Sequence, residues 1–231
     1  QYDAVNRLTG LQHSDAGSNS INDYQYTLDA TGRRTEIAEN NGRVSLYSYD
    51  ELYRLTREQI IDPTNGHYNA DYRYDNVGNR SYSIIDGVHT AYSYDANDRL
   101  TQQGATRYDY DDNGNLTGET GEQHSTGYRY NSQNQLIEIT RTDADNPGAT
   151  RLTRYQYNPD GIRNRSETGG IATTQLIDAN RDYAQVIAEL DQTNQAVKSY
   201  LYGDDLIRQT LLDQITQTEA DYYYHYDGLG S

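Results

Sequence analysis

The sequence contains no cysteine, methionine, tryptophan or phenylalanine, and only 3 of its 231 residues are proline. Without cysteine the chain can form neither disulfides nor thiol-based metal sites, so cysteine usage does not indicate a redox compartment. No run approaches the roughly 20 apolar residues of a membrane-spanning helix, and no signal peptide is recognisable. Because the chain begins at Gln1 and lacks methionine, we expect it to be a piece of a longer polypeptide.

Positive charge is also scarce, since 19 basic residues stand against 35 acidic ones and the net charge is −16 at pH 7. An acidic chain without a basic stripe repels a phosphate backbone, which argues against nucleic-acid binding. Lys198 is the single lysine, so nearly all basic residues are arginine. The planar guanidinium of arginine suits fixed hydrogen bonds and stacking on aromatic rings.

Tyrosine is the only aromatic residue of the chain, and it occurs 25 times. Hydrophobic residues make up 34% of the sequence, and low hydrophobicity with a high net charge can indicate disorder. Disordered segments are poor in aromatic residues, however, and a tyrosine can bury about 150–250 Å² while its hydroxyl keeps a hydrogen bond. We therefore expect an ordered chain whose core is built from tyrosine.

A short pattern recurs along the chain: a tyrosine, any residue, a second tyrosine or leucine, and then aspartate or asparagine. Between positions 3 and 158 it returns every 16 to 27 residues, a period typical of repeat proteins. Residues spaced i and i+2 share one face of a β-strand, so the paired tyrosines would form a common face. Copies of the pattern place anchors at Tyr47, Tyr49, Asp50, Tyr72, Tyr74, Asp75, Tyr92, Tyr94, Asp95, Tyr108, Tyr110, Asp111, Tyr128, Tyr130, Tyr155, Tyr157, Tyr224, Tyr226 and Asp227.

The residues that follow each copy have the chemistry of a turn. Aspartate or asparagine at the first position can cap a type I turn, and glycine at the fourth position tolerates a positive φ. Asparagine and aspartate are the next best residues for that conformation, but Tyr53 is not, so we expect strain or a different turn there. The fourth-position residues are Gly78, Gly114 and Gly161 in some copies and Asn6, Asp98 and Asn134 in others.

Each unit of the sequence therefore predicts a strand, a four-residue turn, a second strand and a looser connection. A lone hairpin is marginal in water, whereas stacked hairpins can bury their tyrosine faces on one another. We predict an all-β fold of tandem β-hairpins that form a continuous spiralling sheet, either a partial shell or a β-solenoid. Residues 1–170 would form the repeat array. Residues 171–231 would form a second segment that continues the same sheet. Within it, residues 171–218 depart from the period, and their more aliphatic stretches could be helical by propensity. We expect strands there, because residues 185–191 are followed by the turn-like Gln192, Thr193 and Asn194.

The repeats resemble a known family. Residues 74–80 and 110–117 are similar to the YD repeats of bacterial Rhs proteins, insecticidal Tc toxin components and teneurins. Residues 178–186, 200–207 and 224–231 resemble the Rhs-associated core region that follows those repeats, so the resemblance covers nearly the whole chain. It implies a long β-sheet that spirals into a hollow shell, which in the toxin members encloses a C-terminal toxic polypeptide. In several members an aspartyl site downstream of the core region releases this cargo, but no cleavage residue can be carried over to this sequence, which we expect to form only part of a shell.

Groups that could carry chemistry do not form recognisable motifs. The string at residues 109–114 resembles the first half of an EF-hand loop, but Thr120 stands where a calcium loop requires glutamate. The histidines lack metal-ligand spacing, and no nucleophile elbow occurs. We therefore predict no catalytic residue, no cofactor, no metal and no enzymatic activity. The histidines in question are His13, His67, His89, His124 and His225.

These observations predict a structural protein from a secreted or cell-surface bacterial context, one that forms part of a shell enclosing or presenting a cargo such as a toxin. Its partners would be the enclosed cargo or the remainder of its own polypeptide. Two alternatives remain open. Unpaired sheet edges could join copies into an extracellular fibre or sheath. Exposed tyrosines could instead stack on sugar rings in a glycan-binding adhesin, an alternative that buried tyrosines would weaken.

Overall fold

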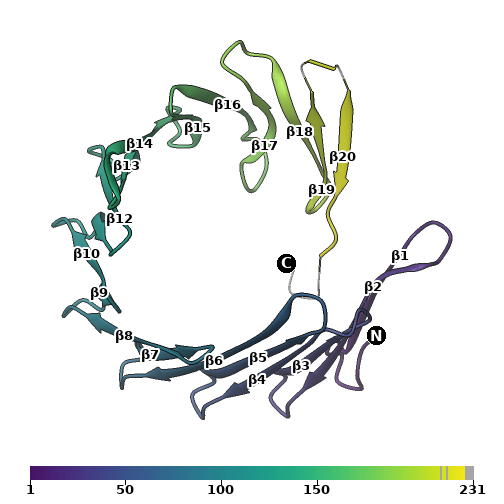
Figure 1. The fold of residues 1–231 in the computed structure, drawn as a ribbon. Helices are drawn as coiled ribbons and strands as arrows, with labels where there is room; N and C mark the ends of the chain where they lie inside the picture. The colour runs from purple at the N-terminus through teal and green to yellow at the C-terminus, as the bar shows by residue number, and fades with distance from the viewer. Residues whose placement is uncertain (214, 217, 227–231) are drawn as a thin grey trace. The chain divides into compact units, whose positions relative to one another are not determined.

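The computed structural model describes residues 1–213, 215–216 and 218–226. These residues form twenty β-strands, which confirms the predicted all-β fold of tandem hairpins. In the described part of the chain no helix is long and apolar enough to cross a membrane. The chain divides into two compact units, one made of residues 1–104 with residues 225 and 226, and the other of residues 105–224. Figure 1 shows how hairpin follows hairpin along each of them.

The first unit is an antiparallel meander in which each strand pairs with the strand that follows it in sequence, from β1 to β9. Before β1, an isolated bridge joins Tyr2 to Leu8 and closes the first turn. The strands are β1 (Gly10–Ser14), β2 (Ser20–Leu28), β3 (Arg34–Glu39), β4 (Val44–Tyr49), β5 (Leu55–Asp62), β6 (Gly66–Tyr74), β7 (Arg80–Ile85), β8 (Val88–Tyr94) and β9 (Leu100–Gln103).

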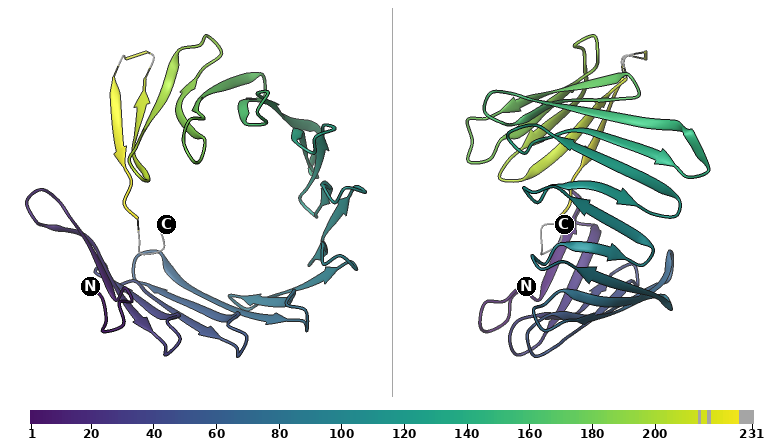
Figure 2. Two further views of the ribbon diagram at one scale, coloured as in Figure 1. Left: turned by 180° about the vertical axis from the view of Figure 1, so that it is seen from behind. Right: turned by 90° about the vertical axis from the view of Figure 1, so that its left-hand side faces the viewer.

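The second unit repeats this arrangement from β10 to β20, and the right-hand view of Figure 2 shows its strands running alternately in opposite directions. Pairing continues from β15 into β16 and onward, so the aliphatic segments after residue 170 are strands, as predicted. The strands are β10 (Thr106–Tyr110), β11 (Leu116–Thr120), β12 (His124–Tyr130), β13 (Leu136–Asp143), β14 (Asn146–Tyr157), β15 (Arg163–Thr168), β16 (Ile171–Asp178), β17 (Gln185–Leu190), β18 (Ala196–Tyr202), β19 (Leu206–Leu212) and β20 (Glu219–Tyr223).

The most buried side chains of the first unit share one face of its sheet. Tyr72 lies opposite Ser83 across β6 and β7, and both are buried, whereas Arg73 beside Tyr72 points to the other face and is exposed. Ala70, two residues before Tyr72, is fully buried on the same face. Small residues next to large rings leave room for the rings to lie across neighbouring strands. The core is therefore a layer of tyrosine over alanine and serine rather than a conventional aliphatic core.

A β-bulge recurs at the residue just before most of the turns that begin with aspartate or asparagine, a feature that the sequence pattern did not predict. Between β4 and β5, Ser48 pairs with Arg57 and Tyr49 pairs with Leu55, so Thr56 is the extra residue. The same shift occurs at Leu28, Tyr74, Tyr94, Tyr110, Tyr130, Tyr157 and Tyr202. A bulge adds local twist and re-aims the side chains beside it. Its recurrence therefore adds local twist before each of these turns.

Candidate functional site

Nine hairpin turns that directly follow a tyrosine or a leucine share one geometry, which the turn at Asp15 also has. They are easiest to compare when the aspartate or asparagine is counted as position 1. The N–H of position 1 donates to the carbonyl of position 5, and the N–H of position 4 donates to the carbonyl of position 1. Position 4 has a positive φ in every case, from 58° at Asn134 to 105° at Gly78. The turns begin at Asp3, Asp29, Asp50, Asp75, Asp95, Asp111, Asn131, Asn158 and Asp191.

Tyr53 occupies position 4 without changing the turn. Its φ is 65°, and its N–H donates to the Asp50 carbonyl at 3.0 Å, so of the two expected outcomes the structure has strain at this residue and not a different turn. A bulky side chain is unfavourable in the left-handed region. The guanidinium carbon of Arg33 lies 4.5 Å from the centroid of the Tyr53 ring, and this cation–π contact offsets part of the cost.

The side chain at position 1 holds the turn closed. At Asp95, Oδ1 accepts the N–H groups of Asn97 and Arg99 at 2.9 and 3.0 Å, and Oδ2 accepts the Arg99 Nε at 2.6 Å. All nine turns have the two backbone bonds to Oδ1, so aspartate and asparagine are interchangeable in this role. The pairs in which arginine at position 5 adds an ion pair are Asp3–Arg7, Asp29–Arg33, Asp50–Arg54 and Asp95–Arg99.

These hydrogen bonds lower the pKa of the turn aspartates. At Asp95 the main cause of the lowered pKa is the backbone N–H of Arg99, and at Asp111 it is the side-chain amide of Asn115. Partial desolvation opposes the shift in both cases but does not cancel it. The carboxylates are therefore ionised acceptors at neutral pH, which fits a structural role and does not suit general acid catalysis.

The lowered pKa values predict that the fold loses stability in acid. Because the folded pKa of these carboxyls lies below the ordinary value of 3.8, the unfolded chain takes up protons first as the pH falls. The stabilisation is complete above the unfolded pKa and is lost as the pH falls through the folded pKa, so the loss begins near pH ~4. Urea unfolding at neutral pH and at about pH 3 measures the effect, and equal urea midpoints would contradict it.

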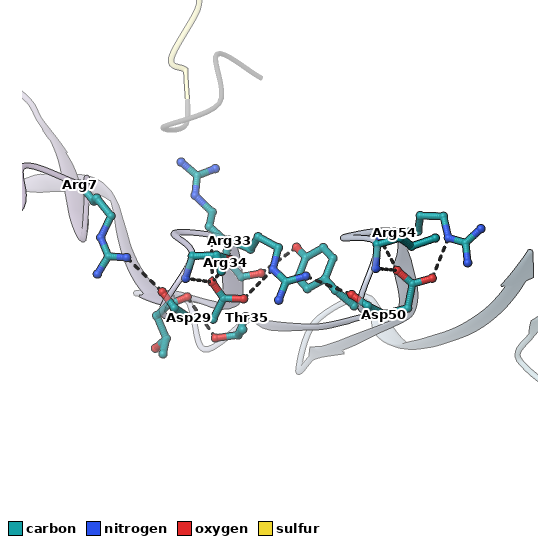
Figure 3. A network of polar contacts seen from close by, with 11 residues as sticks. Arg7, Asp29, Arg33, Arg34, Thr35, Asp50 and Arg54 are labelled. Carbon is teal, nitrogen blue, oxygen red and sulfur yellow. Dashed lines mark hydrogen bonds and ion pairs between the residues drawn. The ribbon is translucent and has the colours of Figure 1, made fainter. Parts of the chain in front are cut away.

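The side chain at position 5 also reaches the next turn along the sheet. The Nη1 of Arg33 donates to the carbonyl of Asp50 at 3.3 Å, and Figure 3 shows this bond between two turns that are each closed by their own ion pair. Other position 5 side chains do the same, and we call the whole series the turn ladder. Two further rungs end on the carbonyl of position 1, from Arg7 to Asp29 at 3.1 Å and from Arg54 to Asp75 at 3.2 Å. Three end on position 4 of the next turn: Asn79 on the Asp98 Oδ1 at 2.8 Å, Asn115 on the Asn134 Oδ1 at 3.0 Å and Gln135 on the Gly161 carbonyl at 3.4 Å.

Tyrosine hydroxyls add a second set of bonds between successive turns. The hydroxyl of Tyr74, the residue just before its turn, donates at 2.6 Å to the carbonyl of Leu55, which is position 6 of the preceding turn. The second tyrosine of the repeat thus ties its own hairpin to the one before it. The equivalent bonds run from Tyr49 to Arg34 at 2.8 Å, from Tyr94 to Arg80 at 3.1 Å, from Tyr157 to Leu136 at 2.8 Å and from Tyr202 to Val186 at 3.1 Å.

Burial of the predicted tyrosine anchors is uneven. Tyr72 is 6% exposed, Tyr224 is 40% exposed, and Asp227 lies outside the described residues. The anchors Tyr47, Tyr49, Tyr74, Tyr92, Tyr94, Tyr108, Tyr110, Tyr128, Tyr130, Tyr155, Tyr157 and Tyr226 are half-buried. Asp50, Asp75, Asp95 and Asp111 lie at position 1 of their turns, and Gly78, Gly114 and Gly161 lie at position 4 with φ of 105°, 85° and 79°.

The residues that sequence reasoning missed are those at position 5. A signal for them was present, because Asp-x-x-x-Arg occurs at Asp29 and Arg33 and again at Asp95 and Arg99. This spacing alone does not distinguish an arginine that bonds the turns from an arginine on the solvated surface. Only the position of the next hairpin shows that the same guanidinium bonds both its own turn and its neighbour.

We expect Arg33→Ala to lower the free energy of unfolding by about 1–2 kcal/mol. A surface ion pair contributes little, so most of this loss would come from the bond to the Asp50 carbonyl and the stacking on Tyr49 and Tyr53. Urea unfolding is the measurement. Arg33→Gln is the matched control, because Gln135 forms a rung from the same position, and it should lose less than Arg33→Ala. Equal losses for both variants would show that the rung contributes nothing.

In the described part of the chain, no three His, Cys, Asp or Glu side chains are grouped so that they could hold a metal ion. The EF-hand-like string is explained by the turn that it contains. Asp111 is position 1 of that turn and Oδ1 accepts the N–H groups of Asn113 and Asn115. The spacing of its acidic residues therefore follows from the repeat.

Comparison with known proteins places the repeats in a family. Residues 29–65 and 110–147 match the RHS Repeat family. The chain is 30% identical over 233 residues to the tRNA3(Ser)-specific nuclease WapA of Bacillus spizizenii, and 30% identical over 186 residues to the tRNA nuclease WapA of Bacillus subtilis. These alignments cover 99% and 79% of this chain but 9% and 7% of the two relatives, so the chain spans less than a tenth of either protein.

Solved structures share the fold. The Photorhabdus luminescens Tc holotoxin pore with a mutation in TccC3 aligns over 89% of this chain and 13% of its own, with a TM-score of 0.56 and 16% identity. The TcdB2-TccC3-Cdc42 structure aligns over 90% of this chain and 13% of its own, with a TM-score of 0.53 and 15% identity. At these identities the likeness is one of fold.

Proposed function

Because this chain belongs to the RHS-repeat family, we propose that it is a non-enzymatic wall segment of a secreted or cell-surface bacterial shell that encloses or presents a cargo polypeptide such as a toxin. The turn ladder is the observation that carries the proposal. Its rungs and the tyrosine hydroxyl bonds tie each hairpin to the next in addition to the sheet pairing. A wall needs this lateral continuity, whereas an isolated binding module does not.

The arrangement of the core also favours a wall. Each strand contacts the strands beside it, and the described residues of each unit form a single sheet layer without a second layer packed against it. One face of the first unit carries Tyr26 and Tyr72, with small buried residues between the rings. A sheet of this kind can be extended by adding hairpins, because each new unit needs only its predecessor for support.

The proposed cargo follows from the relatives. The WapA proteins are named as tRNA nucleases, and the aligned part is less than a tenth of their length. We assign any such activity to a part of the longer polypeptide other than this wall segment. This assignment rests on the turn aspartates, whose carboxylates are occupied by backbone and arginine donors.

Protease protection of the parent polypeptide tests the proposal. If the repeats enclose a cargo, limited proteolysis under native conditions should leave the cargo segment intact, and the same protease should degrade it once the wall has been unfolded by urea. A cargo that is cleaved at the same rate in both conditions would overturn enclosure. Electron micrographs of the same sample separate the alternatives, since filaments would favour the fibre and particles with a hollow interior would favour the shell.

A further inference from the structure

Position 6 carries leucine or arginine in eight of the nine turns, and in the ninth it is Ala196. Leucine at this position belongs to the ordinary repeat, whereas arginine places a cation over the ring of the tyrosine three residues before the turn. The Arg34 guanidinium carbon lies 4.2 Å from the Tyr26 centroid, and Arg80 lies 4.4 Å from that of Tyr72. The fold does not require this cation, because position 6 is leucine in five other turns and alanine in one. Position 6 is leucine at residues 8, 55, 100, 116 and 136, and arginine at residues 34, 80 and 163.

Arg34 differs from the arginine next to it in having no carboxylate partner among the described residues. Arg33 is ion-paired with Asp29 at 2.6 Å, whereas the Arg34 guanidinium points away from the turn ladder in Figure 3. Its Nη1 is buried and makes no hydrogen bond within the described part of the chain. A desolvated donor on a charged group is unfavourable unless it is satisfied, so this guanidinium is poised for an anionic acceptor.

Arg34 lines a pocket of about 490 Å³ on the tyrosine face of the first unit. Ile37, Tyr47, Tyr49 and Leu55 give it aliphatic and aromatic walls. Gly32 and Arg33 complete the lining, and the Arg33 guanidinium is held by Asp29 and by the Asp50 carbonyl. The Tyr49 hydroxyl is already committed to the Arg34 carbonyl, so the wall has few free polar groups besides the guanidinium. A largely apolar pocket with a few placed polar groups is the usual form of a ligand site.

We infer that this pocket binds a carboxylate carried on an apolar group, such as an acidic side chain within an apolar stretch of the enclosed polypeptide. Charge complementarity selects the ligand: an unpaired guanidinium requires an anion, and the aliphatic walls require an apolar carrier. Sugar hydroxyls would leave the charge unpaired, and the net charge of −16 disfavours a phosphate polymer. That the carboxylate belongs to an enclosed polypeptide rests on the proposed function, whereas the presence of the binding site on this chain does not.

Titration of the 231-residue chain with N-acetyl-L-leucine tests the site. Binding is followed by NMR, with N-acetyl-L-leucinamide as the neutral analogue and inorganic phosphate as the anion without an apolar group. Loss of one charge-assisted hydrogen bond should weaken binding roughly 10- to 100-fold. We expect that loss for the amide with the wild-type chain and for N-acetyl-L-leucine with Arg34→Leu, and we expect phosphate to bind more weakly than N-acetyl-L-leucine.

Arg34→Leu is a matched variant because leucine occupies position 6 of five other turns, so the variant should fold, which urea unfolding verifies. Arg163→Leu is the control, since it makes the same exchange outside this pocket and should leave binding unchanged. Three results would each overturn the inference. The wild-type chain could bind N-acetyl-L-leucine and its amide equally, it could bind neither, or Arg34→Leu could bind N-acetyl-L-leucine as tightly as the wild-type chain does. Protease protection decides separately whether the wall encloses a cargo, so the two proposals can fail independently.

Discussion

Replacing Tyr72 with alanine is expected to lower the free energy of unfolding by about 3–5 kcal/mol, the range seen for truncation of large aromatic side chains in a core. The Tyr72 side chain is 6% exposed and lies opposite the buried Ser83. Truncation would leave a cavity beside Ala70 and would remove the ring on which Arg80 stacks at 4.4 Å. Arg80 would then keep only the more distant Tyr92 ring, at 5.7 Å, and the lost contact with Tyr72 adds to the destabilisation.

Two variants serve as controls for this prediction, and urea unfolding is the measurement for all three. Tyr72→Phe keeps the ring and removes only a hydroxyl whose contact with the Tyr68 hydroxyl is long, at 3.4 Å, so its effect should be small. Tyr222→Ala truncates a tyrosine that is 53% exposed, and it should change the free energy of unfolding by less than about 0.5 kcal/mol. A Tyr72→Ala variant as stable as Tyr222→Ala would show that the tyrosine layer is not the core.

Gly78→Val should destabilise the chain by about 1–3 kcal/mol, which is the cost of holding a non-glycine residue in a rare backbone conformation. Gly78 has a φ of 105°, the largest of the nine turns, and a β-branched side chain strongly disfavours that region. A Cβ added at Gly78 would meet no atom within 4 Å. The expected cost therefore comes from the backbone alone and not from a clash.

The neighbouring residue provides the control for the glycine prediction. Val77 is 75% exposed in the same turn, so Val77→Ala should leave the free energy of unfolding within about 0.5 kcal/mol of the wild-type value. Gly78→Asn should lose less than Gly78→Val, because Asn134 holds position 4 of an equivalent turn at a φ of 58°. If valine and asparagine cost the same in urea unfolding, the positive φ is not what position 4 requires.

The local parts of the fold could be predicted from the sequence because their causes are local. The i, i+2 spacing of Tyr72 and Tyr74 indicates a strand, and the sequence of residues 75–78 contains the cap and the glycine that the turn needs. Strands were also predicted after residue 170, where the turn-like Gln192, Thr193 and Asn194 outweighed helical propensity. Such features depend on residues within one hairpin, so the chain can be interpreted one hairpin at a time.

The features that escaped prediction depend on two hairpins at once. Whether Arg33 is a solvated surface residue or a rung to Asp50 is decided by where the next turn lies. The same holds for burial, since Tyr72 and Tyr92 are the first tyrosines of two successive repeats, yet only Tyr72 is buried and Tyr92 is half-buried. The bulge at Tyr49 could not be predicted from the repeat pattern, because it changes which residues pair across the two strands and not which residues are present.

The purely sequential pairing of the strands has a consequence for how the chain is delivered. Among the described residues of each unit, a strand contacts only the strands adjacent to it in sequence, so no hairpin has to wait for a distant segment before it can form. Low contact order permits rapid local folding. A polypeptide threaded from its N-terminus through a narrow export channel could therefore fold on the far side one hairpin at a time, and each finished hairpin would oppose backward sliding of the chain.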